Sequence, residues 1–513
     1  MRDRMEAGLP AGGVVVFALV VSLAGIGVPG LWFDEVATLA ASQRSWDALG
    51  RMLTDVDAVH AAYYALMHVW LGVVGYTPAL LRVPSALAVA ATAGVVAEVA
   101  RRLWGRAAAI VAGAAFVVLP RTVWMAIEAR SFAMATLFLS LGVLFMLRAL
   151  TTGLRRYWVA NTVVTAVACV LFFYCYLALP ALWVAAGWQM RAQRRPLGPL
   201  VASSAAGVLP ALPVALMAIG QRGQVSWIPL VGPGDVVALP RVFLGGFLGD
   251  LFPMRIVVVS SLALVLAVAV ALWGLVERLR SASGEAGSEG RSGVRGEPGE
   301  SASLGGGPLA VLLLGWAGLP ALALLAAGTV LPLYDPKYCA ISAPALALVV
   351  GAGLTGLLDA RRSVMRAVCA ALAAVALGGL GVQYWAAIRQ PDAKGDVLAV
   401  ARTVGAVKRP GDGLWIQHDS LARVARYAYP DDFAGMRDLT LDRDLEGSPT
   451  LWETEIPIAD AGLRLAGVRR VIGVSLTARD ASDELATLTR LGFREDGVRD
   501  VGDYRVWILE RRS

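Results

Sequence analysis

The feature that most constrains the fold is a series of apolar runs, each close to 20 residues long, that recurs through the first three quarters of the chain. A helix of about 20 residues spans the hydrocarbon core of a bilayer, which is about 30 Å thick. Of the 513 residues, 57% are hydrophobic and 17% are charged, whereas soluble domains carry about 25% charged residues. The sequence therefore predicts an α-helical polytopic membrane protein.

About eleven transmembrane helices are predicted, and the basic residues set their orientation. With the N-terminus in the cytoplasm, the cytoplasmic segments hold 18 of the 27 Lys and Arg residues among the first 388, which is the bias expected of cytoplasmic loops. The same bias predicts that the apolar segment 59–75 lies along the outer interface and does not cross. The predicted spans are 11–31, 79–100, 106–120, 131–150, 157–175, 177–190, 198–219, 255–276, 308–331, 338–358 and 366–387.

The composition changes near residue 389. Residues 389–513 hold 21 acidic and 19 basic residues, and within them GDGLWIQHDS, GVRRVIGVSL and YRVWILERR are typical of short strands, whereas DASDELATLTRLGF is typical of a helix. We expect a transmembrane domain at 1–388 and a small C-terminal α/β domain at 389–513, which an odd number of spans makes extracytoplasmic. A Gly-, Ser- and Glu-rich stretch predicts a disordered cytoplasmic loop at about 281–306.

The charge and the rare residue types exclude some classes of function. The first 388 residues carry 27 basic and 18 acidic residues, an excess that indicates membrane topology, and no nucleic-acid partner is expected. The four cysteines lie in or beside apolar runs without metal-like spacing. Three histidines argue against a His-rich metal site.

Charged and aromatic residues gather at the predicted outer ends of the spans. In PGLWFDEVATLAASQ, two carboxylates follow directly where the first apolar run stops. Ionisable groups at such positions are costly unless they are paired or functional. Each residue alone has an ordinary structural explanation, such as a helix cap, an ion pair or an interfacial position. Together they predict a site on one membrane face, built from Asp34, Glu35, Asp55, Asp57, His60, Tyr63, Tyr64, Glu128, Arg130, Tyr174, Tyr176, Tyr334, Asp335, Lys337 and Tyr338.

The order of these motifs resembles that of the GT-C glycosyltransferases. The motifs are W-x-D-E, a His before a Tyr-rich segment, L-R-x-P-S-A-L, E-A-R-S-F-A, and a basic residue with Tyr that opens a late span. The resemblance covers roughly residues 10–390 and is to the bacterial protein mannosyltransferases and aminoarabinose transferases, of the glycosyltransferase family 39 type. Such enzymes move a sugar from a polyprenyl-phosphate donor to an acceptor at the outer face of the cytoplasmic membrane.

The resemblance implies roles for individual residues. Asp34 matches the candidate catalytic base, and Glu35 and Glu128 are further catalytic candidates. HAAYY lacks the two prolines of the usual H-P-P-L-Y-Y, and Lys337 stands where Arg is commoner, which removes the bidentate fork for a phosphate. A divalent metal (Mg or Mn) held by Asp34, His60 or Glu128 is left open. The donor-phosphate residues are Arg130, Lys337 and Tyr338, and the substrate-binding residues are His60, Tyr63, Tyr64, Tyr174 and Asp335.

The expected chemistry explains why such groups are needed. The leaving group is a phosphate, so Lys337 and Arg130 would stabilise its charge, and the acceptor hydroxyl would lose its proton to Asp34. One base with a phosphate leaving group predicts inversion at the anomeric carbon. Abundant Gly and Ala with Arg in excess of Lys is typical of GC-rich bacteria, for which a mannose- or arabinose-like sugar is expected. The acceptor is a lipid, a polysaccharide or a protein of the cell envelope.

Two other classes of function stay open. A lipid or glycan transporter or flippase would place its polar groups within spans and often shows an internal repeat, whereas these acids lie at span ends. A non-catalytic assembly subunit with the same fold is compatible with the altered HAAYY motif. The C-terminal domain shows no catalytic motif and is expected to bind the acceptor or to serve a structural role.

Overall fold

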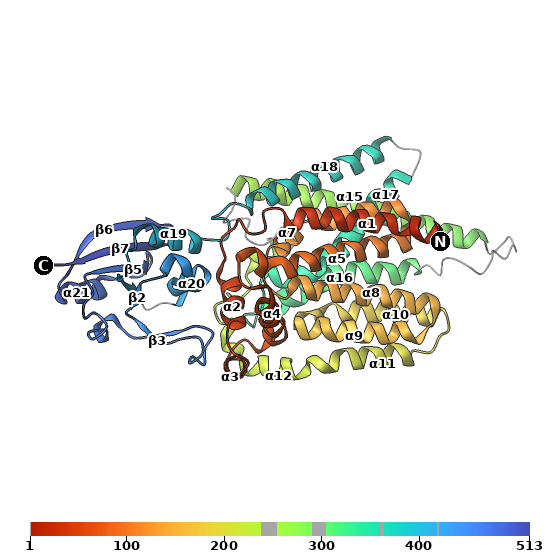
Figure 1. The fold of residues 1–513 in the computed structure, drawn as a ribbon. Coiled ribbons are helices and arrows are strands. Elements are labelled where there is room, and N and C mark those ends of the chain that lie inside the picture. The colour runs from red at the N-terminus through yellow and green to blue at the C-terminus, as the bar shows by residue number, and fades with distance from the viewer. Residues whose placement is uncertain (1, 238–253, 290–303, 360–363, 418–419, 513) are drawn as a thin grey trace. The chain divides into compact units, whose positions relative to one another are not determined.

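The computed structural model describes residues 2–237, 254–289, 304–359, 364–417 and 420–512. The chain separates into two compact units (Figure 1), which are described separately. Unit 1 comprises Met1–Ala24 and Val83–Ala387, and unit 2 comprises Gly25–Arg82 and Ile388–Ser513. The segment that follows the first apolar run therefore belongs to the same unit as the C-terminal segment, an association that the sequence did not predict.

Unit 1 is a bundle of apolar helices, most of which lie side by side with similar axes (Figure 1). Its elements are α1 (Arg2–Leu23), α5 (Pro78–Trp104, from Val83 onward), α6 (Arg106–Val118), α7 (Pro120–Ala126), α8 (Phe132–Thr152), α9 (Arg155–Leu171), η2 (Phe173–Leu177), α10 (Leu179–Ala192), α11 (Gly198–Val208), η3 (Leu209–Ala211), α12 (Leu212–Gly220), η4 (Arg222–Val225), α13 (Pro233–Val237), α15 (Met254–Glu289), α16 (Gly306–Gly328), η6 (Pro336–Ser342), α17 (Ala343–Asp359) and α18 (Val364–Ala387).

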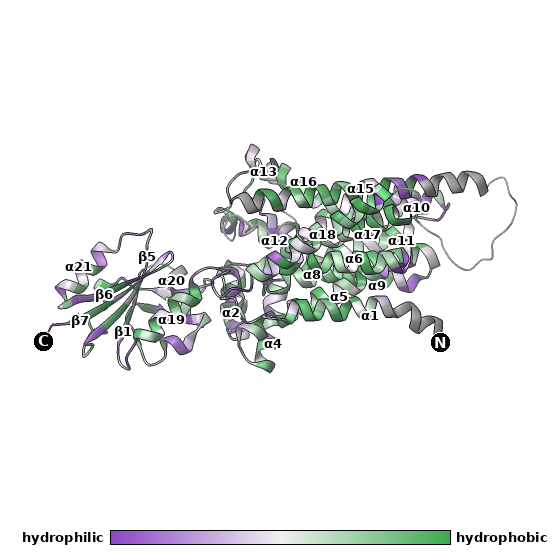
Figure 2. Ribbon diagram, turned by 90° about the horizontal axis from the view of Figure 1, so that it is seen from above, coloured by the Kyte–Doolittle hydropathy of each residue, from purple (hydrophilic) through white to green (hydrophobic). Residues whose placement is uncertain are grey.

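The helices of unit 1 suit a bilayer. Within the described residues, seven helices are long and apolar enough to cross a membrane, or eight if α6 and α7, bent by 66°, form one span. The bundle is hydrophobic along its length (Figure 2), and its outward-facing side chains include large apolar residues such as Val163, Leu216 and Leu372. An apolar exterior of this kind faces lipid, because water would make it costly. The chain is a multi-pass membrane protein.

Every predicted span contains a helix, although the first, 11–31, is helical only as far as Leu23, and the apolar parts of three of these helices are shorter than 18 residues. The apolar part of α1 (Pro10–Leu23) has 14 residues, and α9 and α10 have 17 and 14. The total of eleven crossings therefore stays a prediction. The apolar segment at 59–75 forms α4, a 14-residue helix of unit 2, which is also too short by this criterion.

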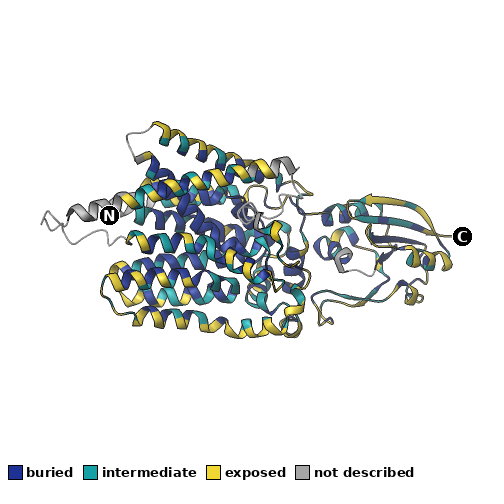
Figure 3. Ribbon diagram, turned by 180° about the vertical axis from the view of Figure 1, so that it is seen from behind, coloured by how far each residue is buried: buried dark blue, intermediate teal, exposed yellow. Residues whose placement is uncertain are grey.

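Close helix packing in unit 1 depends on small residues. A Cβ added to Gly353 in α17 would overlap the carbonyl oxygen of Ala271 in α15, and one added to Gly274 in α15 would overlap Gly353. Small residues let helix backbones approach when lipid supplies no hydrophobic drive between helices. Figure 3 shows the buried residues gathered inside the bundle.

The structure differs from the prediction at the loop placed at about 281–306. Helix α15 continues to Glu289, so the first nine residues of that stretch are helical. The segment SASGEAGSE contains Ala and Glu, which favour helix, and only two glycines. The stretch 290–303 lies outside the described residues.

Unit 2 combines helices from the first loop with a C-terminal α/β domain. Its elements are α2 (Phe33–Ser42), α3 (Trp46–Asp55), η1 (Ala58–His60), α4 (Ala61–Val74), the first turn of α5, α19 (Val397–Val407), β1 (Gly413–Ile416), α20 (Ser420–Ala428), η7 (Pro430–Phe433), β2 (Arg437–Asp438), β3 (Leu441–Arg443), β4 (Thr454–Glu455), η8 (Ile458–Asp460), β5 (Arg470–Leu476), α21 (Ser482–Arg490), β6 (Phe493–Val501) and β7 (Tyr504–Arg511).

The described strands form a five-stranded mixed sheet and a two-stranded ribbon. The order in the larger sheet is β2-β1-β5-β7-β6, with β1 parallel to β2 and β5, and with β7 antiparallel to β5 and β6. Successive side chains point to opposite faces of a strand. Trp415, Val471 and Leu509 therefore pack on one face with Leu488 of α21 and Phe493. The predicted small C-terminal α/β domain is confirmed.

The first loop is joined to the C-terminal domain by buried backbone groups and charged side chains. The N–H of Gly30 donates to the carbonyl of Pro391 at 2.9 Å, and the N–H of Leu31 donates to the Tyr429 hydroxyl at 2.9 Å. The guanidinium of Arg44, which is fully buried, donates to the carbonyl of Ser448 at 2.8 Å. These contacts explain why residues 25–82 and the C-terminal segment form one unit.

The sheet makes a testable prediction at Gly473 in β5. A Cβ there would overlap the ring of Trp415, which is fully buried on the neighbouring strand. Gly473→Ala should lower the stability of unit 2 by about 1–3 kcal/mol, the usual cost of overpacking a core. The control is Gly497→Ala in β6, where nothing lies within 4 Å of an added Cβ. Thermal unfolding of the purified protein checks both, and equal midpoints would contradict the packing described.

Candidate active site

The candidate site in unit 2 begins at the first turn of α2. Asp34 and Glu35 are the second and third residues of this helix, and both are buried. The N-cap residue Trp32 makes no capping bond through its side chain, so the two carboxylates supply the negative charge that a helix N-terminus favours. The hydroxyl of Thr38 donates to the carbonyl of Asp34 at 3.3 Å.

Glu35 lies in a buried ion cluster with two cations. Its carboxylate oxygens accept from Nε and Nη2 of Arg82, both at 2.7 Å, and one of them accepts from Nζ of Lys394 at 3.0 Å. The three side chains are 0% exposed. The guanidinium of Arg82 also donates to three carbonyls at 2.8–2.9 Å, those of Ile26, Pro29 and Gly30.

These contacts fix both the charge of Glu35 and the start of α2. Burial alone would raise the pKa of Glu35, but the charges of Arg82 and Lys394 and their hydrogen bonds outweigh it, so the pKa is lowered. A bidentate pair with a guanidinium is geometrically specific. The carboxylate of Glu35 thus holds the chain before α2 in place, next to Asp34.

The Tyr-rich segment supplies the other predicted residues of unit 2. The Tyr64 hydroxyl donates to Asp57 Oδ2 at 2.7 Å, the rings of His60 and Tyr64 have centroids 5.6 Å apart, and Tyr63 is fully buried. Asp57 has a left-handed backbone conformation, with φ of 57°, which is uncommon for a residue other than Gly. This turn leads into η1 and α4, and α4 begins with Ala61 and Ala62, which follow His60 where the usual motif H-P-P-L-Y-Y has its two prolines.

In unit 1, Glu128 and Arg130 lie in the short connection between α7 and α8. Both side chains are buried, and the N–H of Arg130 donates to the carbonyl of Glu128 at 2.9 Å. Pro120 begins α7 at the bend that follows α6. A proline at a helix start sets the direction of the chain, and here it leads α7 towards this connection.

A second group of predicted residues lies at the start of η6. The carboxylate of Asp335 accepts from the N–H of Lys337 at 2.9 Å and lies 3.8 Å from Lys337 Nζ. The ammonium of Lys337 is 5.3 Å from the ring centroid of Trp227 and 5.7 Å from that of Tyr338. Cation–π contacts at these distances hold a lysine in place while leaving its positive charge intact.

Aromatic rings connect these parts of unit 1. Tyr174 of η2 stacks on Tyr338 of η6 with ring centroids 4.9 Å apart. The ring of Phe132, two residues after Arg130, lies 6.4 Å from that of Tyr338 and 4.9 Å from that of Phe172. The structure therefore gathers the Arg130 connection, Tyr174, Lys337 and Tyr338 around one aromatic cluster.

The predicted site residues divide between the two units. Of the eleven residues that were given roles, Asp34, Glu35, His60, Tyr63 and Tyr64 belong to unit 2, whereas the other six belong to unit 1. Across the part of the chain that the structure describes, no group of three or more His, Cys, Asp or Glu residues could hold a metal ion. The six residues of unit 1 are Glu128, Arg130, Tyr174, Asp335, Lys337 and Tyr338.

Sequence reasoning gave no role to three residues that complete these clusters. Arg82 interrupts an apolar run, which is costly without a partner and was a usable signal for its pairing with a carboxylate. Lys394 sits in an ordinary polar stretch, QPDAKGDV, and nothing in its surroundings pointed to Glu35. Trp227 lies about 110 residues before Lys337, so only the folded chain shows their contact.

The fold and these clusters define a class, the polytopic membrane proteins with a GT-C fold. Two crystal structures of ArnT from Cupriavidus metallidurans share it over 96% of this chain and 97% of theirs at 14% identity, with TM-scores of 0.57 when bound to undecaprenyl phosphate and 0.59 in the apo state. The Archaeoglobus fulgidus oligosaccharyltransferase aligns with a TM-score of 0.46 at 12% identity, covering 91% and 69%. No family model and no curated protein matches the sequence.

The ion cluster of unit 2 predicts a pH-dependent loss of stability in Glu35→Gln. At neutral pH this change leaves Arg82 and Lys394 buried without their carboxylate, and breaking a buried pair costs about 3–5 kcal/mol. The pKa of Glu35 is lower in the folded protein than its unfolded value near 4.5. The carboxylate therefore contributes fully to stability above pH 4.5, and this contribution is lost as the pH falls through the folded pKa. The difference in free energy of unfolding between wild type and Glu35→Gln should therefore become smaller below pH 4.5.

Thermal unfolding in detergent at neutral and acidic pH measures this difference. Asp47→Asn is the control, since Asp47 is an exposed acid in the first turn of α3 and should be near neutral in effect. A Glu35→Gln protein as stable as wild type at pH 7 would contradict the role given to the cluster.

Proposed function

We propose that this protein is a membrane glycosyltransferase that moves a sugar from a polyprenyl-phosphate donor to an acceptor. The observation that carries the proposal is the cationic aromatic cluster of unit 1, where Lys337 lies beside Trp227 and Tyr338 at the end of an apolar bundle. The same fold occurs in ArnT, one of whose crystal structures is bound to undecaprenyl phosphate. A lipid with an anionic headgroup matches both properties of this cluster.

The donor phosphate would bind at Lys337 and Arg130. Both side chains are at least nine-tenths buried, and a charge in such surroundings acts on a phosphate more strongly than it would in water. Asp335 lies 3.8 Å from the ammonium, long for an ion pair, so it orients Lys337 more than it neutralises it. The stacked rings of Tyr174 and Tyr338 would flank the headgroup.

The prenyl chain would lie in an open apolar groove between α10 and α16. The groove has a volume of about 330 Å³, and at Gly315 the two helices are so close that a Cβ would overlap that of Ala181. Farther along α16, Leu324 and Leu325 pack in the cluster that includes Tyr174 and Tyr338. One helix thus connects the groove to the cationic cluster. The groove is lined by Pro180, Ala181, Val184, Val311, Leu314, Gly315, Leu319 and Leu322.

Asp34 would act as the general base. An acceptor hydroxyl attacks the anomeric carbon, its proton passes to the carboxylate of Asp34, and the bond from that carbon to the phosphate oxygen breaks. The electron pair of that bond leaves with the polyprenyl phosphate, whose negative charge Lys337 and Arg130 stabilise. A single displacement inverts the configuration of the sugar. Glu35 keeps its partners throughout and fixes the position of Asp34.

The setting proposed for the reaction is the outer face of a bacterial cytoplasmic membrane, with the C-terminal domain extracytoplasmic. The basic residues at the predicted cytoplasmic ends of the spans support this orientation. The proposed sugar is mannose- or arabinose-like, and the acceptor is a lipid, a polysaccharide or a protein. Glu128 is the alternative base, because it is a buried carboxylate two residues from Arg130.

The base assignment predicts the behaviour of Asp34→Asn. The amide keeps the size of the side chain but cannot accept the proton, so turnover should fall by roughly 10² to 10⁴ while donor binding is kept. Asp47→Asn makes the same change at the first turn of the next helix and should leave turnover unchanged. Steady-state kinetics with a defined prenyl-phosphate sugar measures both, and near-normal turnover in Asp34→Asn would transfer the role to Glu128.

The phosphate site predicts a different kinetic change at Lys337. Lys337→Ala removes a buried positive charge, so the affinity for the donor should weaken and turnover should fall as the leaving group loses stabilisation. Lys337→Arg keeps the charge and should recover much of the donor affinity. Donor KM and turnover, compared across the three proteins, test this assignment. An Arg variant as weak as the Ala variant would show that packing against Trp227, and not charge, is what matters.

A further inference from the structure

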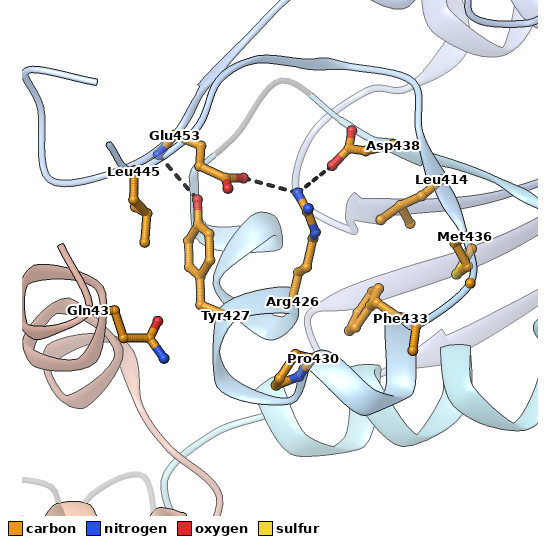
Figure 4. Close-up of a pocket in the computed structure, with 12 residues that line it drawn as sticks. Gln43, Leu414, Arg426, Tyr427, Pro430, Phe433, Met436, Asp438, Leu445 and Glu453 are labelled. Atoms are coloured by element: carbon orange, nitrogen blue, oxygen red, sulfur yellow. Dashed lines mark hydrogen bonds and ion pairs between the residues drawn. The ribbon is translucent and has the colours of Figure 1, made fainter. Parts of the chain in front are cut away.

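Unit 2 contains a polar cavity that the proposed chemistry does not use. Its volume is about 470 Å³, within the range of about 300–1,000 Å³ typical of small-molecule sites. Figure 4 shows Gln43 on one side and Arg426, Asp438 and Glu453 on another. The lining residues are Gln43, Leu414, Arg426, Tyr427, Pro430, Phe433, Ala434, Gly435, Met436, Asp438, Leu445 and Glu453.

The charged side chains of this cavity are held by fixed partners. Arg426 Nη1 donates to Asp438 at 2.7 Å and to Glu453 at 3.2 Å. Behind them, the fully buried Arg423 donates to Asp438 at 2.6 Å and to Glu455 at 2.5 Å. Side chains that neighbours hold in one geometry form a preorganised binding surface, because little freedom is lost when a ligand arrives.

The polar groups of the cavity supply both donors and acceptors. Arg426 is 31% exposed, so some of its N–H groups remain available beside two carboxylates that accept. The amide of Gln43 both donates and accepts. Burial raises the pKa of Glu453, and this effect exceeds the opposing one of Arg426 and Arg423. Neighbouring hydroxyl groups of a sugar, each a donor and an acceptor, fit such a lining.

A row of aromatic rings leads from the cavity to the proposed base. Tyr427 stacks on Trp452 with an interplanar angle of 9° and centroids 6.2 Å apart, and Trp452 lies 4.9 Å from Phe33. Phe33 directly precedes Asp34 in α2, and Gln43 caps the other end of that helix. Gln43 lies nine positions after Asp34, which corresponds to about 14 Å along a helix.

We propose that this cavity binds a neutral oligosaccharide segment of the acceptor, whose chain continues past Trp452 and Phe33 to Asp34. The inference rests on the proposed function, because it assigns the acceptor of the same reaction. A neutral oligosaccharide fits better than a peptide, since the cavity offers mixed donors and acceptors and ring faces, and the two carboxylates balance the charge of Arg426. An acceptor with a polyhydroxylated chain follows, a polysaccharide or a glycolipid.

The test is binding of mannan- and arabinan-derived neutral tetrasaccharides to the purified full-length protein by isothermal titration calorimetry, without donor. Ala434→Trp adds an indole at the cavity wall, leaves every polar lining residue unsubstituted and should abolish binding. Gln43→Ala should weaken binding roughly threefold to tenfold, the effect of one lost hydrogen-bonding group. Gln390→Ala removes an exposed amide that does not line the cavity and should match wild type.

The outcomes separate this inference from the proposed transfer reaction. Tetrasaccharide binding that Ala434→Trp abolishes supports the inference even if no sugar is transferred. Sugar transfer with an acceptor KM that Ala434→Trp leaves unchanged would overturn the inference and leave the transferase intact. Failure of wild type to bind either tetrasaccharide, or binding of acceptor peptides alone, would also overturn it.

Discussion

The buried pairing of Glu35 with Arg82 and Lys394 is the interaction on which unit 2 depends. Removing such charges from water costs several kcal/mol each, so the cluster is tolerable only because every partner is in place. Arg82 satisfies its remaining N–H groups with the carbonyls that precede α2, which fixes the helix start and with it Asp34. The same cluster includes Lys394 from the C-terminal part, so buried charged side chains join the C-terminal domain to the first loop.

In unit 1, the buried ammonium of Lys337 lies against aromatic rings, with the carboxylate of Asp335 3.8 Å away. A lysine at the end of an apolar bundle needs contacts that compensate its lost hydration yet leave its charge available to an anion. Trp227 and Tyr338 meet both needs for Lys337, and the Tyr174 stack holds Tyr338. A carboxylate pair as tight as that of Glu35 would have neutralised the charge that a phosphate needs. This contrast fits a structural role for Arg82 and Lys394, and it supports the phosphate-binding role that we propose for Lys337.

Much of this arrangement could be predicted from the sequence, from the length of its apolar runs and from the free-energy cost of placing charged residues beside them. Length and hydropathy located the helices, and short apolar runs in the C-terminal segment located β1, β5 and β7. Asp34 and Lys337 were predicted as site residues because each is a charged residue directly beside an apolar run. The pairing of Lys394 with Glu35 could not be predicted, because the two residues lie more than 350 positions apart and nothing local distinguishes Lys394. The continuation of α15 beyond its apolar part was missed because a Gly- and Ser-rich composition was taken as a loop.

The central claim is that a lipid-linked sugar is the donor, and transfer of label tests it most directly. Purified protein in native-like membranes would be incubated with polyprenyl phosphates that carry radiolabelled mannose or arabinose, together with envelope extract as acceptor. The account predicts label in a glycan-containing product, with one polyprenyl phosphate released per sugar transferred and with inverted configuration. Donor that stays intact, or that crosses the membrane without loss of its sugar, would contradict the account and indicate a transporter or a non-catalytic subunit.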